Sequence, residues 1–178
     1  MSSVSLVPFA PEHFPALTGW FQSQSEVTQW AGSGPTFPLD GQQLREMLKE
    51  CLAHPPARFC WMAINERGEV IGHTQLAMDW QNGVARLARV AIAPSHRGNA
   101  FSIPMLAAVL SQAFLHSEIE RVELNVFSWN SPAIQTYFRL GFLHEGTRRS
   151  SVQVGSERWD TMLMGLLRHE WERARSAL

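Results

Sequence analysis

The residues around Arg97 could bind a phosphate group. Gly98 and Ala100 are small, so a bulky diphosphate could approach the main chain here, and Arg97 supplies a positive charge. An apolar, Ala-rich run at residues 101–110 follows and predicts a helix, for which Ser102 is the expected N-cap. Free backbone N–H groups and the dipole at a helix start attract anions. The pattern predicts a phosphate-binding turn, although an ordinary connection between a strand and a helix can have the same residue types.

A strand is expected directly before this turn. Residues 87–94 form an apolar run rich in valine and isoleucine, as in a strand buried on both faces, and Pro94 ends it because proline cannot donate to a sheet. The turn lacks the Gly-Lys-Ser/Thr of a Walker A loop and the three glycines of a dinucleotide-binding fingerprint. The sequence therefore argues against a nucleotide triphosphatase and against a Rossmann dehydrogenase.

A second group of polar residues follows the strand predicted at residues 122–127. Asn130 or Ser131 opens a short helix at residues 132–140. Tyr137 is the only tyrosine of the chain. It lies about two helical turns beyond Asn130, so both side chains can face one groove. A phenol at this place could protonate a leaving group, or it could simply anchor the helix on the sheet.

Composition restricts the class of protein and its partners. The chain has 178 residues, of which 45% are hydrophobic and 17% charged, which predicts one folded domain over residues 1–178. Its 15 basic and 16 acidic residues give a net charge of −1, so no general attraction to nucleic acid or to an anionic membrane is expected. The sequence has no signal-peptide pattern, no membrane-spanning run and no metal-ligand spacing of cysteines or histidines. We expect a cytoplasmic protein without a bound metal.

The remaining segments complete a mixed α/β pattern. Turn residues at 65–68 and at Gln81-Asn82-Gly83 predict two hairpins. The other predicted strands are 4–8, 59–64, 70–80, 142–154 and 158–167, and the other predicted helices are 11–24, one that begins after Asp40, and a tail from Arg168.

This order of elements resembles the GCN5-related N-acetyltransferase (GNAT) family. Two motifs carry the resemblance. The first is Val-Ala-Ile-Ala-Pro at 90–94, followed by Arg-Gly-Asn-Ala-Phe-Ser at 97–102, and the second is Asn-Ser-Pro-Ala at 130–133, followed by Tyr137 and by Gly-Phe at 141–142. The resemblance covers most of the chain. It implies a single α/β (α+β) domain with a mixed, mostly antiparallel central sheet of about seven strands flanked by helices.

The resemblance also implies the reaction, in which acetyl-CoA is the donor and a primary amine the acceptor, joined by direct attack in a ternary complex. The turn at Arg97 would hold the diphosphate, and the coenzyme arm would pair with the preceding strand end as an added strand does. Asn130 would contact that arm, and Tyr137 would lie near the sulfur as the acid. The implied coenzyme contacts are Val90, Ala91, Ile92, Arg97, Gly98, Asn99, Ala100, Phe101, Ser102, Ile103, Asn130, Ala133 and Tyr137.

Three residues depart from the family pattern. Ala100 and Ser102 stand where relatives more often have glycine, so we expect coenzyme binding that is weakened but retained. Arg86 stands where many relatives have a carboxylate, so the usual base is missing. A base matters because a lysine-like amine, with a pKa of about 10, is protonated at neutral pH, whereas an α-amine has a pKa of about 8. His73 and Glu123 are the base candidates, although a strand histidine and a solvated strand carboxylate are also common structural features.

Trp30, Asp79 and Trp129 are the candidates for acceptor binding. Trp30 adjoins the loop that borders the acceptor cleft in relatives, and Asp79 could attract a cationic amine. Residues 26–30 are similar to the branch that includes ribosomal-protein N-acetyltransferases, so one expected acceptor is a protein N-terminal amine. The alternatives are a small-molecule amine (polyamine, amino acid or aminoglycoside) and a CoA-binding module without turnover. Acidic residues are not clustered in the N-terminal half, which disfavours a polycation. Exposed aromatic residues would permit a homodimer.

Overall fold

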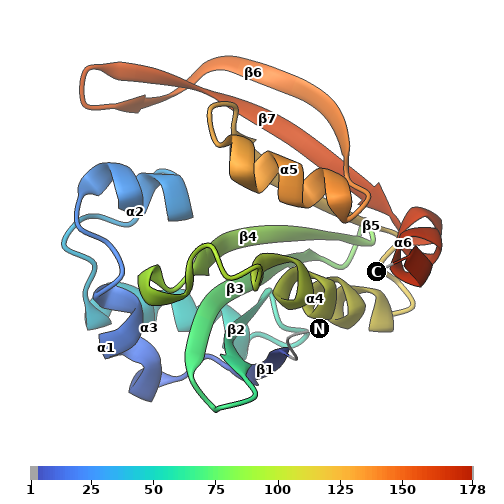
Figure 1. Cartoon of the computed structure of the whole chain (residues 1–178), viewed down its shortest axis with the longest axis horizontal. Coiled ribbons are helices and arrows are strands. Elements are labelled where there is room, and N and C mark those ends of the chain that lie inside the picture. Colours follow the sequence, from blue (N-terminus) through green and yellow to red (C-terminus); the bar gives the residue numbers. More distant parts are fainter. Residues whose placement is uncertain (1–3, 178) are drawn as a thin grey trace.

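A seven-stranded sheet runs through the part of the chain that the computed structural model describes, residues 4–177 (Figure 1). Residues 1–3 and 178, which the expected domain 1–178 includes, lie outside the described residues. The strands are β1 (Val4–Pro8), β2 (Arg58–Asn65), β3 (Val70–Asp79), β4 (Val84–Ile92), β5 (Arg121–Phe127), β6 (Leu143–Val154) and β7 (Glu157–Leu167). The α-helices are α1 (Phe14–Thr18), α2 (Gln24–Ala31), α3 (Gly41–Lys49), α4 (Ser102–Leu115), α5 (Ser131–Arg139) and α6 (Arg168–Ala174). Short 3-10 helices are η1 (Pro11–His13), η2 (Glu50–Leu52), η3 (Pro94–His96) and η4 (Arg175–Ala177).

The strand order β1-β2-β3-β4-β5-β7-β6 contains one parallel pair, β4 and β5, and every other neighbouring pair is antiparallel. The predicted turns at 65–68 and at Asn82-Gly83 join β2 to β3 and β3 to β4. A parallel pair cannot be joined by a tight turn, and α4 provides the crossover from β4 to β5. The mixed, mostly antiparallel sheet implied by the family resemblance is therefore confirmed.

Two expectations about helix boundaries were wrong. The helix predicted over 11–24 ends at Thr18, and α2 begins separately at Gln24, because the Ser23 side chain accepts a hydrogen bond from the Glu26 N–H and caps a new helix. Ser102 is the first residue of α4 and not its N-cap; Phe101 holds the cap position and provides no side-chain acceptor. At α5 the structure decides between the two proposed caps, since Asn130 Oδ1 accepts from the Ala133 N–H at 3.4 Å.

The two faces of the sheet are covered by different helices. Leu87 and its neighbours on alternate positions pack against α4 and α5, and we call this side the α4 face. Met62 and the other alternate set pack against α1, α2 and α3, and we call this side the α2 face. Figure 1 shows α5 beside the β6–β7 ribbon, and α1, α2 and α3 together at the left of the view.

β4 and β5 are paired only over part of their length. The pairing includes Val84–Leu87 of β4 and Arg121–Leu124 of β5, and it stops there. Beyond Leu87 the register between β3 and β4 also shifts, and Arg89 adopts a positive φ of 50°. A bulge of this kind bends a strand away from its partner. The remainder of β4 therefore presents an edge that β5 does not cover.

One polar cluster is enclosed on the α2 face. The His73 ring is fully buried against Phe9, with the ring centroids 4.8 Å apart, and against Met62. His73 Nε2 lies 2.9 Å from the amide nitrogen of Gln75. Burial, with smaller contributions from Arg89 and His13, lowers the pKa of His73 from 6.5 to about 3. The imidazole is therefore neutral at physiological pH.

Gly83 provides the first prediction. A Cβ at this positive-φ position would lie 2.4 Å from the Glu118 carbonyl oxygen, whereas Gly155 has a similar φ and nothing within 4 Å of its Cβ position. Both glycine-to-alanine changes introduce backbone strain, but only Gly83→Ala adds this overlap. We expect Gly83→Ala to lower the free energy of unfolding by about 2 kcal/mol more than the control Gly155→Ala, as measured by urea denaturation. Equal losses would contradict the close approach of the Glu118 carbonyl oxygen to Gly83.

His73 provides the second prediction. Between pH 6.5 and pH 3 the unfolded chain binds a proton at this histidine that the folded chain does not bind. The contribution of His73 to stability is therefore full above pH 6.5 and falls as the pH is lowered, by at most about 1.4 kcal/mol per pH unit. We expect His73→Gln to flatten the pH dependence of the unfolding free energy in this window. The exposed His169→Gln is the control, and an unchanged slope in His73→Gln would refute the assignment.

Candidate active site

A cavity of about 700 Å³ lies where β4 and β5 diverge. It is lined from both faces of the sheet. β4 contributes residues 86–92 and β5 contributes residues 125–127. The start of α4, the first turns of α5, the last two turns of α2 and part of the β6–β7 ribbon complete the wall. The cavity is thus a direct consequence of the short β4–β5 pairing.

The turn before α4 keeps a shape suited to an anion. Arg97 and Ser102 both line the cavity. Gly98 has a φ of 79° and Ala100 a φ of 59°, so Ala100 adopts the left-handed conformation that glycine prefers. The backbone path of the turn therefore survives the departure from the family pattern at Ala100. The first N–H groups of α4 have no acceptor within the helix, and Arg97 shortly precedes them in the sequence. Together these N–H groups and the guanidinium suit a diphosphate.

Val90, Ala91 and Ile92 also line the cavity. Ala91 and Ile92 pair with β3 on one side only, because β5 has turned away. An extended ligand can use such a free edge as an additional strand would. Of the other expected coenzyme contacts, Gly98, Asn99, Ala100, Phe101 and Ile103 belong to the turn and helix start but are not part of the cavity wall.

α5 brings Asn130, Ala133 and Tyr137 to the cavity wall. Burial raises the pKa of Tyr137, so its phenol stays protonated throughout the physiological range. The Tyr137 ring packs edge-on against Phe142, with the ring centroids 5.8 Å apart. Within residues 4–177 its hydroxyl makes no hydrogen bond to another residue. The site therefore contains a buried, protonated donor group.

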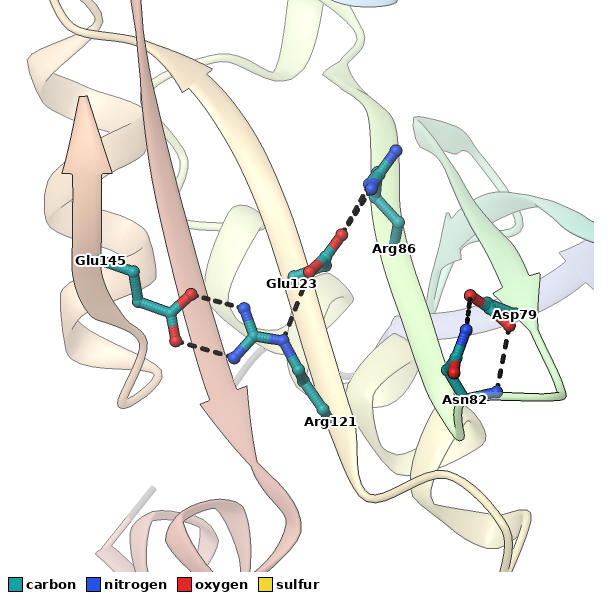
Figure 2. A network of polar contacts seen from close by, with 6 residues as sticks. All are labelled: Asp79, Asn82, Arg86, Arg121, Glu123 and Glu145. Atoms are coloured by element: carbon teal, nitrogen blue, oxygen red, sulfur yellow. Dashed lines mark hydrogen bonds and ion pairs between the residues drawn. The ribbon is translucent and has the colours of Figure 1, made fainter. Parts of the chain in front are cut away.

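The two expected base candidates do not lie in the cavity wall. His73 is enclosed by Phe9, Met62 and Trp30, and its lowered pKa makes it a poor proton acceptor. Glu123 lies between two arginines, as Figure 2 shows, with Arg86 Nη2 at 2.5 Å and Arg121 Nε at 3.3 Å from its carboxylate oxygens. A carboxylate held in this way is poorly placed to take a proton from an amine.

Of the expected acceptor residues, Trp30 alone lines the cavity. It is buried, and its indole N–H donates to the Arg89 carbonyl oxygen at 2.8 Å. Asp79 ends β3 and is not part of the cavity wall; it accepts hydrogen bonds from Asn82 (Figure 2), which lower its carboxyl pKa. Trp129 is 47% exposed and packs against Phe127 and Trp159 outside the cavity wall.

Sequence reasoning did not identify four cavity residues with charged side chains, Glu26, Arg58, Arg89 and Arg148. They come from α2, β2, β4 and β6, and no local motif connects them. Only the order of the strands brings them to one place.

Residues 4–177 contain no group of three or more side chains that could hold a metal ion. None of the helices described here is both long and apolar enough to span a membrane.

The chain is similar to known N-acetyltransferases. The model of the Acetyltransferase (GNAT) family matches residues 20–142. An uncharacterized, SPbeta prophage-derived N-acetyltransferase of Bacillus subtilis, YokL, is 28% identical over 137 residues, which cover 76% of each chain. The uncharacterized N-acetyltransferase p20 of Bacillus licheniformis is 24% identical over 153 residues, which cover 85% of each chain.

Solved structures share the fold. A spermidine N-acetyltransferase from Vibrio cholerae, in complex with CoA and spermine, superimposes with a TM-score of 0.83 and 18% identity, over 96% of this chain and 98% of that one. None of these three names mentions a ribosomal protein, so the assignment to that branch stays a prediction. Because the family model spans more than half of the chain, this protein belongs to the GNAT family and is an acetyl-CoA-dependent N-acetyltransferase.

Proposed function

We propose that this enzyme acetylates the primary amine of a small molecule by direct attack within a ternary complex. One observation carries the proposal: the cavity at the β4–β5 divergence is lined from both faces of the sheet, so donor and acceptor can meet from opposite sides. Its volume of about 700 Å³ suits small ligands. The similar Vibrio cholerae fold belongs to an enzyme named for spermidine, which is a small amine.

The donor would bind from the α4 face. Arg97 and the N–H groups at the start of α4 would hold the diphosphate, the free edge at residues 90–92 would pair with the coenzyme arm, and Asn130 would contact that arm. Acetyl-CoA supplies a thioester carbonyl that is open to attack by a neutral amine. The acceptor would then bind on the α2 face, beside Trp30.

Tyr137 would act as the acid. The acceptor nitrogen forms a bond to the acetyl carbon as the carbon–sulfur bond breaks, the nitrogen loses one proton to water, and the Tyr137 hydroxyl gives its proton to the sulfur. Water then reprotonates the phenolate. The raised pKa of Tyr137 means that its hydroxyl carries a proton when the substrates bind.

A peptide N-terminal amine is the second candidate acceptor. Within the described cavity wall the only carboxylate is that of Glu26, there is no imidazole, and Glu26 already accepts the Gln22 N–H at 2.7 Å. An α-amine with a pKa of about 8 needs little help to lose its proton.

Arg97 gives the first functional prediction. Calorimetric titration with acetyl-CoA should show binding that Arg97→Ala weakens by about tenfold, because one charged contact to the diphosphate is lost. Arg67→Ala, an exposed arginine in the β2–β3 turn, is the matched control and should bind as the parent does. Unchanged affinity in Arg97→Ala would remove the diphosphate assignment.

Tyr137 gives the second. Tyr137→Phe keeps the ring in place and removes only the hydroxyl, so acetyl-CoA affinity should stay within twofold of the parent while kcat falls by about 100-fold. Steady-state assays of CoA release and the same calorimetry would measure the two quantities. A variant with the kcat of the parent would mean that Tyr137 only packs α5 on the sheet.

A further inference from the structure

Four arginines gather on the α2 face of the sheet around the cavity. Arg86 lies between Ala85 and Leu87, whose side chains pack on the α4 face, so its own side chain points to the α2 face. Arg58 starts β2, Arg89 lies in the bulge of β4, and Arg148 lies opposite Thr161 in the β6–β7 ribbon. Glu26 is the only carboxylate among the described residues that line this space.

Two of these charges are balanced within the protein. Arg58 Nε lies 2.8 Å from a Glu50 carboxylate oxygen. Arg86 pairs with Glu123, which Arg121 also contacts (Figure 2). These guanidinium groups therefore contribute little net field in the cavity.

The other two are not balanced. Neither Arg89 nor Arg148 makes an ion pair with any residue of the described range 4–177. Arg148 is exposed, whereas Arg89 is half-buried, with Nη1 3.4 Å from the Gln75 side-chain oxygen. The Arg89 guanidinium lies 5.9 Å from the centre of the Trp30 ring.

A half-buried guanidinium without an anion is costly, because it has lost water and gained no counter-charge. Consistent with this, burial lowers the pKa of Arg89, and the effect of the nearby Arg58 in the same direction is opposed by Cys60 and Glu50. The Trp30 indole N–H holds the main chain of Arg89 through its carbonyl oxygen, and the guanidinium itself contacts the Gln75 side chain and the Trp30 ring. The cavity thus presents a half-buried positive charge that an anionic group of a ligand could balance.

We propose, on the basis of the acetyltransferase function proposed above, that the acceptor is a small primary amine that also carries an anionic group, a carboxylate or a phosphate, bound by Arg89 and Arg148. A polyamine brings only positive charges, and the single carboxylate of the wall offers it little attraction.

Matched pairs of amines test the proposal. Phosphoethanolamine against ethanolamine, and phenylalanine against phenethylamine, differ in the anionic group, and spermidine represents the polyamines. We expect kcat/KM for CoA release to be at least about tenfold higher for the anionic member of a pair than for its partner and for spermidine. Spermidine, or the partners that lack the anionic group, used equally well would overturn this inference and leave the acetyltransferase proposal intact. No acetylation of any amine by protein that binds acetyl-CoA would overturn both.

Variants of β6 test the residues. Arg148 is exposed, so Arg148→Gln should fold as the parent does, and it should lower kcat/KM for phosphoethanolamine by about fivefold without lowering it for ethanolamine. The charge reversal Arg148→Glu should reduce the discrimination further. Arg149→Gln, the exposed neighbour that does not line the cavity, is the matched control. Equal losses for both amines, or an equal effect of Arg149→Gln, would refute the role of Arg148.

Discussion

The structure depends on the point at which β4 leaves β5. Four residues of each strand are paired in parallel, and beyond Leu87 the bulge at Arg89 directs β4 away from its neighbour. A sheet that stayed paired would have filled this space with hydrogen-bonded main chain. Because it does not, the domain contains an open strand edge, and the residues that line the cavity are arranged around it.

The divergence also explains the distribution of charge. Where the strands are still paired, acidic and basic side chains meet across the sheet, as Arg86, Glu123, Arg121 and Glu145 do in Figure 2. Where the strands have parted, Arg89 has no strand neighbour that could offer a carboxylate. The ion pairs that stabilise the sheet therefore lie where β4 and β5 are paired. The unpaired arginine lies on the same face of the sheet, where the two strands have parted.

Much of the fold could be predicted from the sequence, because turns and helix caps depend on residues that are close together in the chain. The turn at Asn82-Gly83 and the helix caps at Asp40 and Asn130 form where the sequence indicated them. The side-chain hydrogen bond at each place joins residues three positions apart. The prediction of a helix over 11–24 was wrong because the apolar spacing continues between the end of α1 and the start of α2. In that interval Trp20 and Phe21 are buried without being helical.

Less of the candidate site could be predicted from the sequence, because its contacts join residues that lie far apart in the chain. The partner of Glu123 is Arg86, 37 residues away, and the enclosure of His73 depends on Phe9 and Trp30 from distant elements. Family motifs pointed to Arg97, Asn130 and Tyr137, which do line one cavity, and their roles stay predictions. The arginines of the α2 face have no motif at all.

The hydrogen bond from Trp30 to the Arg89 carbonyl joins the two halves of the site, since Trp30 lies in α2 and Arg89 in the strand whose free edge faces the donor. If the acceptor displaced α2 when it bound, the hydrogen bond would also move the main chain of β4, to which the donor would bind. The affinities of the two substrates would then be coupled, and thermodynamic linkage requires each to change the other by the same factor.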